Sequence, residues 1–443
     1  MFCNLDPENG GFYFIGIGGV SMSALAILLR GKGYRVRGSD AREGEFTRKA
    51  IAAGIPVHIG ETEEIEEQIV VVTGAAESSP QALKARNDGK TILTRAELLG
   101  KVAACYPHVV SVAGCHGKTT TTSMLAHILK SAGKEFTCHI GGEDLDFGNG
   151  QDLGGDYFVT EACEFKRSFL SLGSEIGIIL NVDLDHTDCY PTEDDLFLAY
   201  AEFATRCKKL IVNGDDRRAR TIPHVSSFGF YEGDIRAVRL FAEGERYSFT
   251  VMERGIPLVR VRLHVVGKVN VLNALAAFAA ARLLGLSAEE IKRGLESFRG
   301  VKRRFEYVGT LGGVPVVCDY AHHPREIAAT LRAAQRVAAG DVQVVFQPHT
   351  YTRTRDLMRE FVVALKKTER PIIYRTYAAR EPFDLAGSAV TLAGRVPDAI
   401  YVQSARQLRE RLLGARLGER DLILVLGAGD IYDVAAQILD EKN

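Results

Sequence analysis

Short apolar runs alternate with longer amphipathic stretches along most of the chain. The runs are rich in β-branched residues and end at glycine or polar residues, as buried parallel strands do, and helical periodicity fills the stretches between them. This alternation predicts an α/β protein with mostly parallel sheets. The predicted strands lie at 12–17, 34–37, 69–73, 109–112, 157–160, 176–180, 314–319, 342–346, 371–374, 399–402 and 422–426.

The pattern divides into three segments, which we expect to be domains covering residues 1–107, 108–300 and 301–443. A chain of 443 residues is long enough for each of them to have its own core. Pro107 lies just before the strand at 109–112, and a proline there is suited to a linker.

The composition changes this picture little. Of the 443 residues, 46% are apolar and 25% charged, and the formal net charge of -1 gives no reason to expect nucleic acid or an anionic membrane as a partner. The eight cysteines include no Cys-x-x-Cys pair, which favours reduced thiols in a cytoplasmic protein. No targeting segment is found, and the longest apolar stretch, 271–284, is too short to cross a bilayer. We expect a monomer or a weak homodimer.

The most informative stretch is 109–129, where a β-branched strand runs into a glycine-containing turn and then a helix. Gly114 and Gly117 let backbone N–H groups approach an anion, and Lys118 can reach terminal phosphates. A threonine hydroxyl within 119–122 can bind Mg2+. The full phosphate-loop spacing would need one more glycine at the end of the strand. An ordinary strand-to-helix turn is the alternative, but it gives no reason for the lysine and four threonines, so the stretch predicts nucleotide binding.

A second glycine-rich turn follows the first predicted strand. Gly18 and Gly19 lead to Ser21 and a helix, and Asp40 lies about twenty positions further on, where dinucleotide-binding folds hold a ribose hydroxyl. The loop after the strand at 69–73 brings Ser78 to the same edge of the sheet. A tight turn without a ligand is the alternative, because a serine replaces the third glycine. The first segment is therefore predicted to be a Rossmann-like domain.

Acidic residues follow two strands of the second segment. Glu161 comes directly after the strand at 157–160, and Glu164, Asp183, His186 and Asp188 lie in the loops nearby. Mg2+ prefers hard oxygen ligands, and Glu161 is the favoured one because strand ends converge there. A solvated loop is the expected explanation for Glu164, Asp183 and Asp188. His186 stays open between a metal ligand, an orienting group and a surface residue.

Two asparagines, Asn270 and Asn273, begin the alanine-rich helix of the second segment. Asparagine is a common N-cap, so Asn270 can simply start this helix. Its amide can also read the edge of an adenine ring, and the sequence leaves both explanations open.

Imidazole and cationic groups follow two neighbouring strands of the third segment. His322 and His323 come after the strand at 314–319, and His349 and Arg353 come after the next one. Together they would suit a small substrate that carries a carboxylate. The alternatives are a helix N-terminal turn for the histidine pair and an ordinary exposed cation for Arg353.

Ten ordered segments give the chain a specific resemblance. From Phe12 to Tyr432 it resembles the Mur ligase family, in the segments GIGGVSMSALA, GSD, GCHGKTTTTSM, TEACEFKRSFL, NVDLDHTD, NVLNALAA, VKRRFE, DYAHHPREI, FQPHTYTRTRDL and LGAGDIY. DYAHHP and QPHTYTRT favour the members that add L-alanine to UDP-N-acetylmuramate over those that add glutamate, a diamino acid or a dipeptide. The resemblance implies an ATP- and Mg2+-dependent ligase of peptidoglycan synthesis. It also implies a P-loop ATPase-like second domain with a mostly parallel sheet, between two Rossmann-like domains.

The resemblance implies roles for individual residues. Those implied for ATP are Gly114, His116, Gly117, Lys118, Thr119, Thr120, Asn270, Asn273 and Asp319. Those implied for Mg2+ are Thr119, Glu161 and, for a second ion, His186. The UDP-sugar would lie on Gly18, Gly19, Ser21, Asp40 and Ser78, and the alanine on His323, His349 and Arg353. The residues implied to act in catalysis are Lys118, Glu161, His186 and Arg304, of which Arg304 would fix the second and third domains around the nucleotide.

The chain departs from the family pattern at four positions. Cys115 replaces the usual threonine of the phosphate loop, Val269 a common histidine, Thr350 a frequent arginine and Ser21 a glycine. Three alternatives remain. They are the family member that adds a recycled tripeptide, an NAD-dependent oxidoreductase built on the Gly18 turn, and a nucleotide-binding regulatory module without catalysis.

Overall fold

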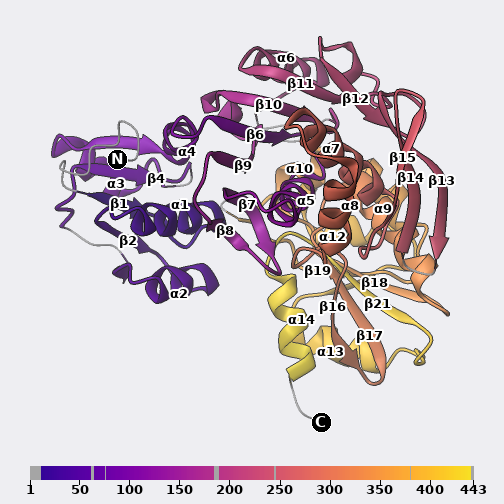
Figure 1. The fold of residues 1–443 in the computed structure, drawn as a ribbon. Coiled ribbons are helices and arrows are strands. Elements are labelled where there is room, and N and C mark those ends of the chain that lie inside the picture. Colours follow the sequence, from indigo (N-terminus) through magenta and orange to yellow (C-terminus); the bar gives the residue numbers. More distant parts are fainter. Residues whose placement is uncertain are drawn as a thin grey trace.

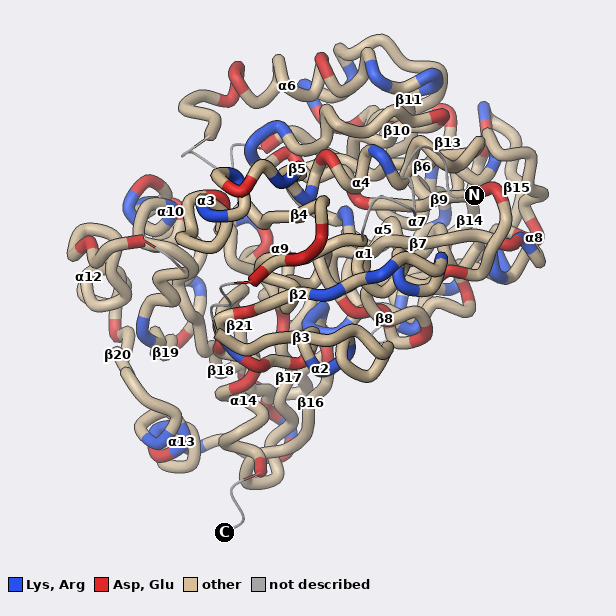
Figure 2. The backbone as a smooth tube through the Cα atoms, turned by 90° about the vertical axis from the view of Figure 1, so that its left-hand side faces the viewer, with Lys and Arg blue, Asp and Glu red and all other residues tan. Residues whose placement is uncertain are grey.

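The computed structural model describes residues 11–60, 64–74, 76–183, 189–243, 246–379 and 381–440. These residues form three sheets, one in each predicted segment, with helices packed around them (Figure 1). The predicted α/β class is confirmed. Acidic and basic residues are interspersed over all three segments (Figure 2). Among the helices that the structure describes, none is long and apolar enough to cross a membrane.

The first sheet has five parallel strands in the order β3-β2-β1-β4-β5. The strands are β1 (Phe12–Ile15), β2 (Val36–Asp40), β3 (Val57–Ile59), β4 (Ile69–Val72) and β5 (Thr91–Thr94). The helices are α1 (Val20–Gly31), α2 (Glu45–Ala52), α3 (Pro80–Asn87) and α4 (Arg95–Ala103). Asp40 is the last residue of β2 rather than a residue beyond it, because it still pairs with Ile59 of β3.

The second sheet has ten strands in the order β15-β14-β13-β12-β11-β10-β6-β9-β7-β8. The strands are β6 (His108–Ala113), β7 (Phe136–Asp144), β8 (Gly148–Asp152), β9 (Tyr157–Glu161), β10 (Ser174–Ile179), β11 (Cys207–Asn213), β12 (Ser226–Gly229), β13 (Ile235–Glu243), β14 (Arg246–Glu253) and β15 (Ile256–Arg262). Its central strands β6, β9 and β10 match predicted strands, whereas the parallel strands β7, β11 and β12 and the antiparallel strands β8, β14 and β15 at its two edges were not predicted.

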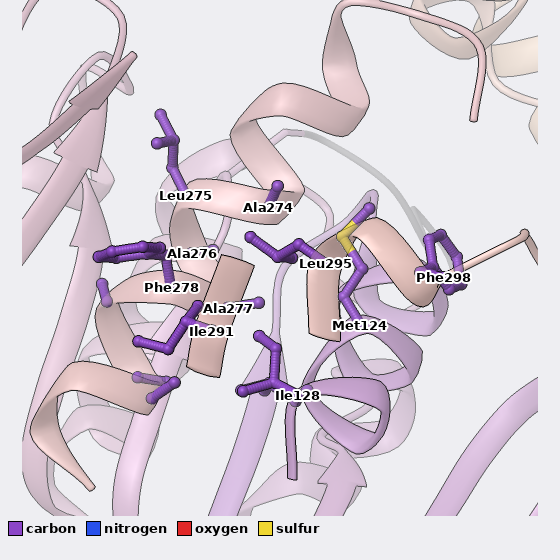
Figure 3. Packing of buried hydrophobic residues seen from close by; sticks show 14 of the residues in the cluster. Met124, Ile128, Ala274, Leu275, Ala276, Ala277, Phe278, Ile291, Leu295 and Phe298 are labelled. Carbon is purple, nitrogen blue, oxygen red and sulfur yellow. The ribbon is translucent and has the colours of Figure 1, made fainter. Parts of the chain in front are cut away.

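Three helices of the second segment, α5 (Lys118–Ser131), α7 (Val269–Leu283) and α8 (Ala288–Ser297), pack together over the sheet. Figure 3 shows Met124 and Ile128 of α5 against Leu295 and the alanines of α7. Helices α5 and α8 approach so closely that a Cβ atom at Gly294 of α8 would lie 2.3 Å from the Cα of Ile128. This packing fixes the helix that follows the phosphate loop. The segment also contains α6 (Glu193–Thr205) and the 3-10 turns η1 (Phe165–Ser171) and η2 (Ala219–Thr221).

The third sheet has six strands in the order β16-β17-β21-β18-β19-β20. The strands are β16 (Glu306–Leu311), β17 (Val314–Asp319), β18 (Val342–Phe346), β19 (Ile372–Tyr374), β20 (Ile400–Val402) and β21 (Leu422–Leu426). All are parallel except β16, an unpredicted edge strand. The helices are α9 (Pro324–Val337), α10 (Tyr351–Asp356), α11 (Met358–Leu365), α12 (Ala389–Ala393), α13 (Ala405–Leu413) and α14 (Ile431–Asp440), with the 3-10 turn η3 (Leu385–Gly387).

The three segments touch one another at the β7–β8 hairpin. Helix α1 packs on this hairpin, where Asn149 Nδ2 donates a hydrogen bond to Val20 O at 2.6 Å. Glu143 of β7 forms ion pairs with Lys49 of α2 at 2.8 Å and with Lys302, between α8 and β16, at 2.6 Å. Glu143 is therefore a meeting point of all three segments.

Candidate active site

The phosphate-loop stretch has the predicted strand, turn and helix. β6 ends at Ala113 and α5 begins at Lys118. Gly114 and Gly117 have φ values of +137° and +88°, which glycine adopts without strain. A Cβ atom at Gly117 would also lie 2.5 Å from Asn273 Oδ1. The turn therefore requires both glycines, and it is packed against the start of α7.

Lys118 is held by a buried carboxylate. Its Nζ donates hydrogen bonds to both oxygens of Glu164, at 3.1 and 2.9 Å, and to Gly114 O at 2.5 Å. The Glu164 side chain is 1% exposed, so the prediction that it lies on a solvated loop is wrong. A buried charge needs a partner, and Lys118 is that partner. Burial lowers the pKa of Lys118, but the neighbouring groups, Glu164 foremost, together raise it by more, so the pKa lies above its usual value and the lysine stays charged.

Thr119 and Glu161, the predicted Mg2+ ligands, lie against two consecutive glycines of β7. A Cβ atom at Gly141 would lie 2.6 Å from Glu161 Oε2, and one at Gly142 would lie 2.8 Å from Thr119 Cγ2. The missing side chains leave space for two hard oxygen donors beside the phosphate loop. This set fits Mg2+, which takes few ligands from protein and the rest from phosphate and water.

The second predicted metal ligand, His186, lies outside the described residues. Among the residues that the structure does describe, no group of three or more His, Cys, Asp or Glu side chains could hold a metal ion.

A cavity of about 510 Å3 opens between the phosphate loop, the start of α7 and helix α9. Its volume is in the range of small-molecule sites. It brings together predicted nucleotide contacts from distant parts of the chain, namely His116, Gly117, Thr120, Asn270, Asn273, Arg304 and Asp319. Apolar side chains, among them Val265, Leu272 and Phe298, complete the lining.

Asn270 is not the N-cap of α7. The N-cap is Lys268, and Asn270 is the second residue of the helix. Its Nδ2 donates a hydrogen bond to Val266 O at 2.7 Å, and its Oδ1 accepts one from Asn273 Nδ2 at 3.0 Å. These bonds hold both amides at the cavity wall, which leaves the adenine contact as the remaining prediction for them.

Asp319 and Arg304 lie where the third segment meets the cavity. Asp319 Oδ2 accepts a hydrogen bond from Phe305 N at 2.8 Å, and Oδ1 accepts one from Ala321 N at 2.9 Å. Burial raises the pKa of Asp319, and Arg304 lowers it in part. The Arg304 guanidinium lies 5.0 Å from the centre of the Tyr320 ring. Asp319 thus anchors the chain on both sides of β16 and β17, and its contact with a ribose stays a prediction.

Asp40 fastens the glycine turn of the first segment. Gly18 N donates a hydrogen bond to Asp40 Oδ2 at 2.8 Å. Ser21 Oγ lies 2.8 Å from Nε2 of the buried His139 on β7, and it accepts a bond from Arg95 at 3.3 Å. Burial and the nearby Arg95 lower the pKa of His139 to about 3, so this imidazole is neutral at pH 7. At the same edge of the sheet lie the two other predicted UDP-sugar contacts, Gly19 and Ser78, which precede α1 and α3.

The predicted amino-acid contacts gather after β17 and β18. Arg353 Nη1 lies 3.2 Å from His349 Nδ1. The His349 ring stacks on Tyr377 with centroids 5.5 Å apart, and its centroid lies 5.8 Å from that of His322. His323 is the N-cap of α9, as the alternative of a helix N-terminal turn predicted. Its ring centroid lies 5.2 Å from that of His116 in the phosphate loop.

Helix α9 contacts the phosphate loop and the loop after β10 through two residues that the sequence analysis missed, Glu326 and Arg325. Arg325 forms an ion pair with Asp183, whose side chain is 10% exposed, so the solvated-loop explanation is wrong for Asp183 as well. Glu326 Oε1 lies 3.0 Å from His116 Nδ1. Glu326 stands three residues after the N-cap His323, and this spacing is a sequence signal for a capping box but not for a contact with the loop.

Three family models match consecutive parts of the chain. They are described as the Mur ligase family catalytic domain, at residues 11–106, the Mur ligase middle domain, at 112–281, and the Mur ligase glutamate ligase domain, at 303–429. All three matches fall inside the predicted segments, whose own boundaries stay a prediction.

Similar proteins cover the chain almost completely. A UDP-N-acetylmuramate--L-alanine ligase of Clostridium acetobutylicum is 39% identical over 446 residues, which cover 97% of each chain. The solved UDP-N-acetylmuramate-alanine ligase of Thermotoga maritima has a TM-score of 0.85 at 26% identity, covering 97% of this chain and 98% of that one. A murein peptide ligase of Psychrobacter arcticus, at 23% identity and a TM-score of 0.73, shares the fold over 97% of this chain and 98% of its own.

Proposed function

The chain belongs to the Mur ligase family, and from this premise we propose that it catalyses the ATP-dependent joining of L-alanine to the lactyl carboxylate of UDP-N-acetylmuramate. The products are UDP-N-acetylmuramoyl-L-alanine, ADP and phosphate, in the cytoplasmic synthesis of peptidoglycan precursors. The observation that carries the proposal is the approach of the third segment to the phosphate loop, with the His116 and His323 rings 5.2 Å apart. Membership of the family removes the oxidoreductase alternative.

In this proposal ATP occupies the cavity of about 510 Å3. Its phosphates lie on the loop 114–120, where Lys118 leaves Glu164 to contact the transferring group. Asn270 and Asn273 face the adenine, Asp319 faces the ribose, and Arg304 joins the second and third segments around the nucleotide. All four of these side chains line one cavity, which supports the assignment.

Thr119 and Glu161 would hold one Mg2+, and the resemblance adds His186 for a second. When bound, Mg2+ neutralises charge on the phosphate oxygens. The glycines at 141 and 142 support this assignment, because any larger residue would push against the two ligands.

The reaction needs two bond exchanges. The γ-phosphoryl group of ATP passes to an oxygen of the lactyl carboxylate, which breaks its bond to ADP and gives an acyl phosphate. The neutral amine of L-alanine then attacks the acyl carbon, phosphate leaves with the C–O electron pair, and the new amide loses a proton. Such transfers depend mainly on positioning and charge neutralisation, which the cation Lys118 can provide.

The two remaining substrates lie on the outer segments in this proposal. The UDP-sugar binds to the domain at 1–107, on Gly18, Gly19, Ser21, Asp40 and Ser78. The pair His349 and Arg353, with His323 nearby, receives the carboxylate of L-alanine in the domain at 301–443. The two domains face the nucleotide domain at 108–300.

The test is phosphate release from ATP and Mg2+ with UDP-N-acetylmuramate present. L-alanine, D-glutamate, a diamino acid and L-alanyl-D-glutamyl-diaminopimelate are added in turn. Turnover with L-alanine alone is expected. Turnover only with the tripeptide would move the protein to the recycling branch of the family, and no turnover with any of them would favour a regulatory module. Lys118→Ala should abolish release, whereas Lys134→Ala, an exposed lysine after the same helix, should not.

A further inference from the structure

Four side chains join the phosphate loop to the third segment. His116 and Asp183 belong to the loops after β6 and β10, and Arg325 and Glu326 belong to the first turn of α9. His116 Nδ1 lies 3.0 Å from Glu326 Oε1, and Arg325 pairs with Asp183. His116 Nε2 lies 3.5 Å from Asp183 Oδ2, which closes the set. All four residues line the cavity of about 510 Å3.

Glu326 uses its two carboxylate oxygens on different parts of the molecule. Oε1 faces His116, whereas Oε2 accepts hydrogen bonds from the backbone N–H groups of His322, at 3.1 Å, and His323, at 3.3 Å. Burial raises the pKa of Glu326, but His322 and His116 lower it further, so the net pKa lies well below its usual range and the carboxylate is charged. One carboxylate, 14% exposed, therefore contacts both a ring in the phosphate loop and the turn that carries the two histidines.

Glu326 links His116 to the turn at His322 and His323, and each of these two parts lies beside a proposed substrate site. The backbone of His116 exchanges hydrogen bonds with the Asn181 side chain at 2.9 and 3.0 Å, so its ring is the part that Glu326 orients. At the other end the His322 ring lies 5.8 Å from the ring of His349, in the proposed alanine site. A shift at one end is therefore passed to the other through a single side chain.

We propose that Glu326 is a positioning residue that couples the nucleotide site to the amino-acid site. Nucleotide binding orders the phosphate loop, the ordered His116 ring holds Glu326, and Glu326 holds the turn at 320–323 in the conformation that accepts the amino acid. The inference rests on the proposed function for the identity of the amino acid, but the coupling itself depends only on nucleotide binding. Arg325 and Asp183 can keep the two segments together when this link is removed.

The first test measures amide hydrogen exchange in the peptide 320–326 with and without ADP and Mg2+. In the wild type, ADP is expected to slow exchange at His322 and His323, because their N–H groups are bonded to Glu326. Glu326→Ala should abolish this slowing. Glu326→Gln should keep most of it, because an amide can accept from the backbone and donate to His116. Glu360→Ala, at an exposed glutamate of α11, is the matched control and should match the wild type.

The second test is a double-variant cycle on kcat/KM for L-alanine. Glu326→Ala and His116→Ala should each lower it by about tenfold to a hundredfold, as expected for the loss of a hydrogen bond to a charged group. The double variant should lose no more than either single variant, since both remove the same link. Glu326→Gln should recover most of the loss at an unchanged melting temperature.

Two results would overturn the proposal. One is ADP-dependent slowing that survives in Glu326→Ala or is missing in the wild type. The other is a double variant whose loss equals the product of the single losses. A wild type that shows the slowing but no alanine-dependent turnover would refute the alanine ligase function and leave the coupling standing.

Discussion

Removing the charge of Glu164 is expected to destabilise the protein most strongly when no nucleotide is bound. Lys118 and Glu164 form an ion pair at 2.9 Å, with side chains 14% and 1% exposed. Glu164→Ala leaves the lysine charge buried without its partner, which costs about 3–5 kcal/mol. For a unit of about 150–250 residues each kcal/mol lowers the melting temperature by about 2–4 °C, so we expect a fall of about 6–20 °C.

The variant Glu164→Gln removes the negative charge of this side chain but keeps its shape. The glutamine oxygen can still accept a hydrogen bond from Lys118, so the loss of stability should be smaller than for alanine. A bound polyphosphate then supplies the missing negative charge. In the wild type the phosphate must first displace Glu164, and in the variant it need not. ADP with Mg2+ should therefore raise the melting temperature of Glu164→Gln by more than that of the wild type.

The assay is thermal unfolding with and without ADP and Mg2+. Glu202→Gln is the matched control, because it removes a surface ion pair with Arg167 whose side chains are 42% and 50% exposed. Such a pair contributes at most about 1 kcal/mol. The reasoning is refuted if Glu164→Gln melts as Glu202→Gln does, or if ADP stabilises it less than it stabilises the wild type.

Three further predictions address the metal site, the buried His139 of β7 and the contacts among segments. Gly141→Ala should raise the Mg2+ concentration needed for half-maximal phosphate release, because its Cβ would lie 2.6 Å from Glu161 Oε2, whereas Gly173→Ala has nothing within 4 Å and should not. His139 has a pKa of about 3 when folded and about 6.5 when unfolded, so between these values the unfolded chain binds the extra proton and the free energy of unfolding decreases as pH is lowered. His139→Val should remove up to about 1.4 kcal/mol per pH unit from that slope in denaturant titrations, and equal slopes would contradict the burial argument. Burial raises the pKa of Glu143, but the ammonium groups of Lys302 and Lys49 lower it to about 2, so its contribution is complete above about pH 4.5 and is lost as pH falls toward 2. Glu143→Gln should increase the radius of gyration in neutral solution, which small-angle scattering measures, and an unchanged radius would show that this ion cluster does not hold the segments together.

The parts of the fold that the sequence predicts best have strong local signals. The strands β17, β18 and β21 match their predicted bounds residue for residue, because each is a short apolar run that ends at a polar residue or glycine. The strands β13 and β15, at one end of the second sheet, were not predicted. Arginines interrupt the apolar pattern of both strands, because one face of an antiparallel sheet can lie in solvent.

The site was predictable where one stretch carries the chemistry, as around Lys118. It was not predictable where a charge is buried by a partner from far along the chain. Asp183 and Glu164 lie in acidic loops that the sequence predicts to be solvated. In the fold, Arg325 pairs with Asp183 and Lys118 pairs with Glu164. The spacing of His323 and Glu326 predicts a helix cap, but a single sequence has no signal that the same carboxylate reaches His116.

The position of β21 has a consequence for how the chain is made. This strand, at 422–426, lies between β17 and β18, so it joins the two halves of the third sheet. A ribosome releases those halves long before it releases the strand that unites them, and until then both keep an unpaired edge exposed to other chains. Nonsense or frameshift changes upstream of Leu422 should therefore yield aggregates rather than an enzyme with a trimmed last domain, and a chaperone that shields strand edges should matter most in the final moments of synthesis.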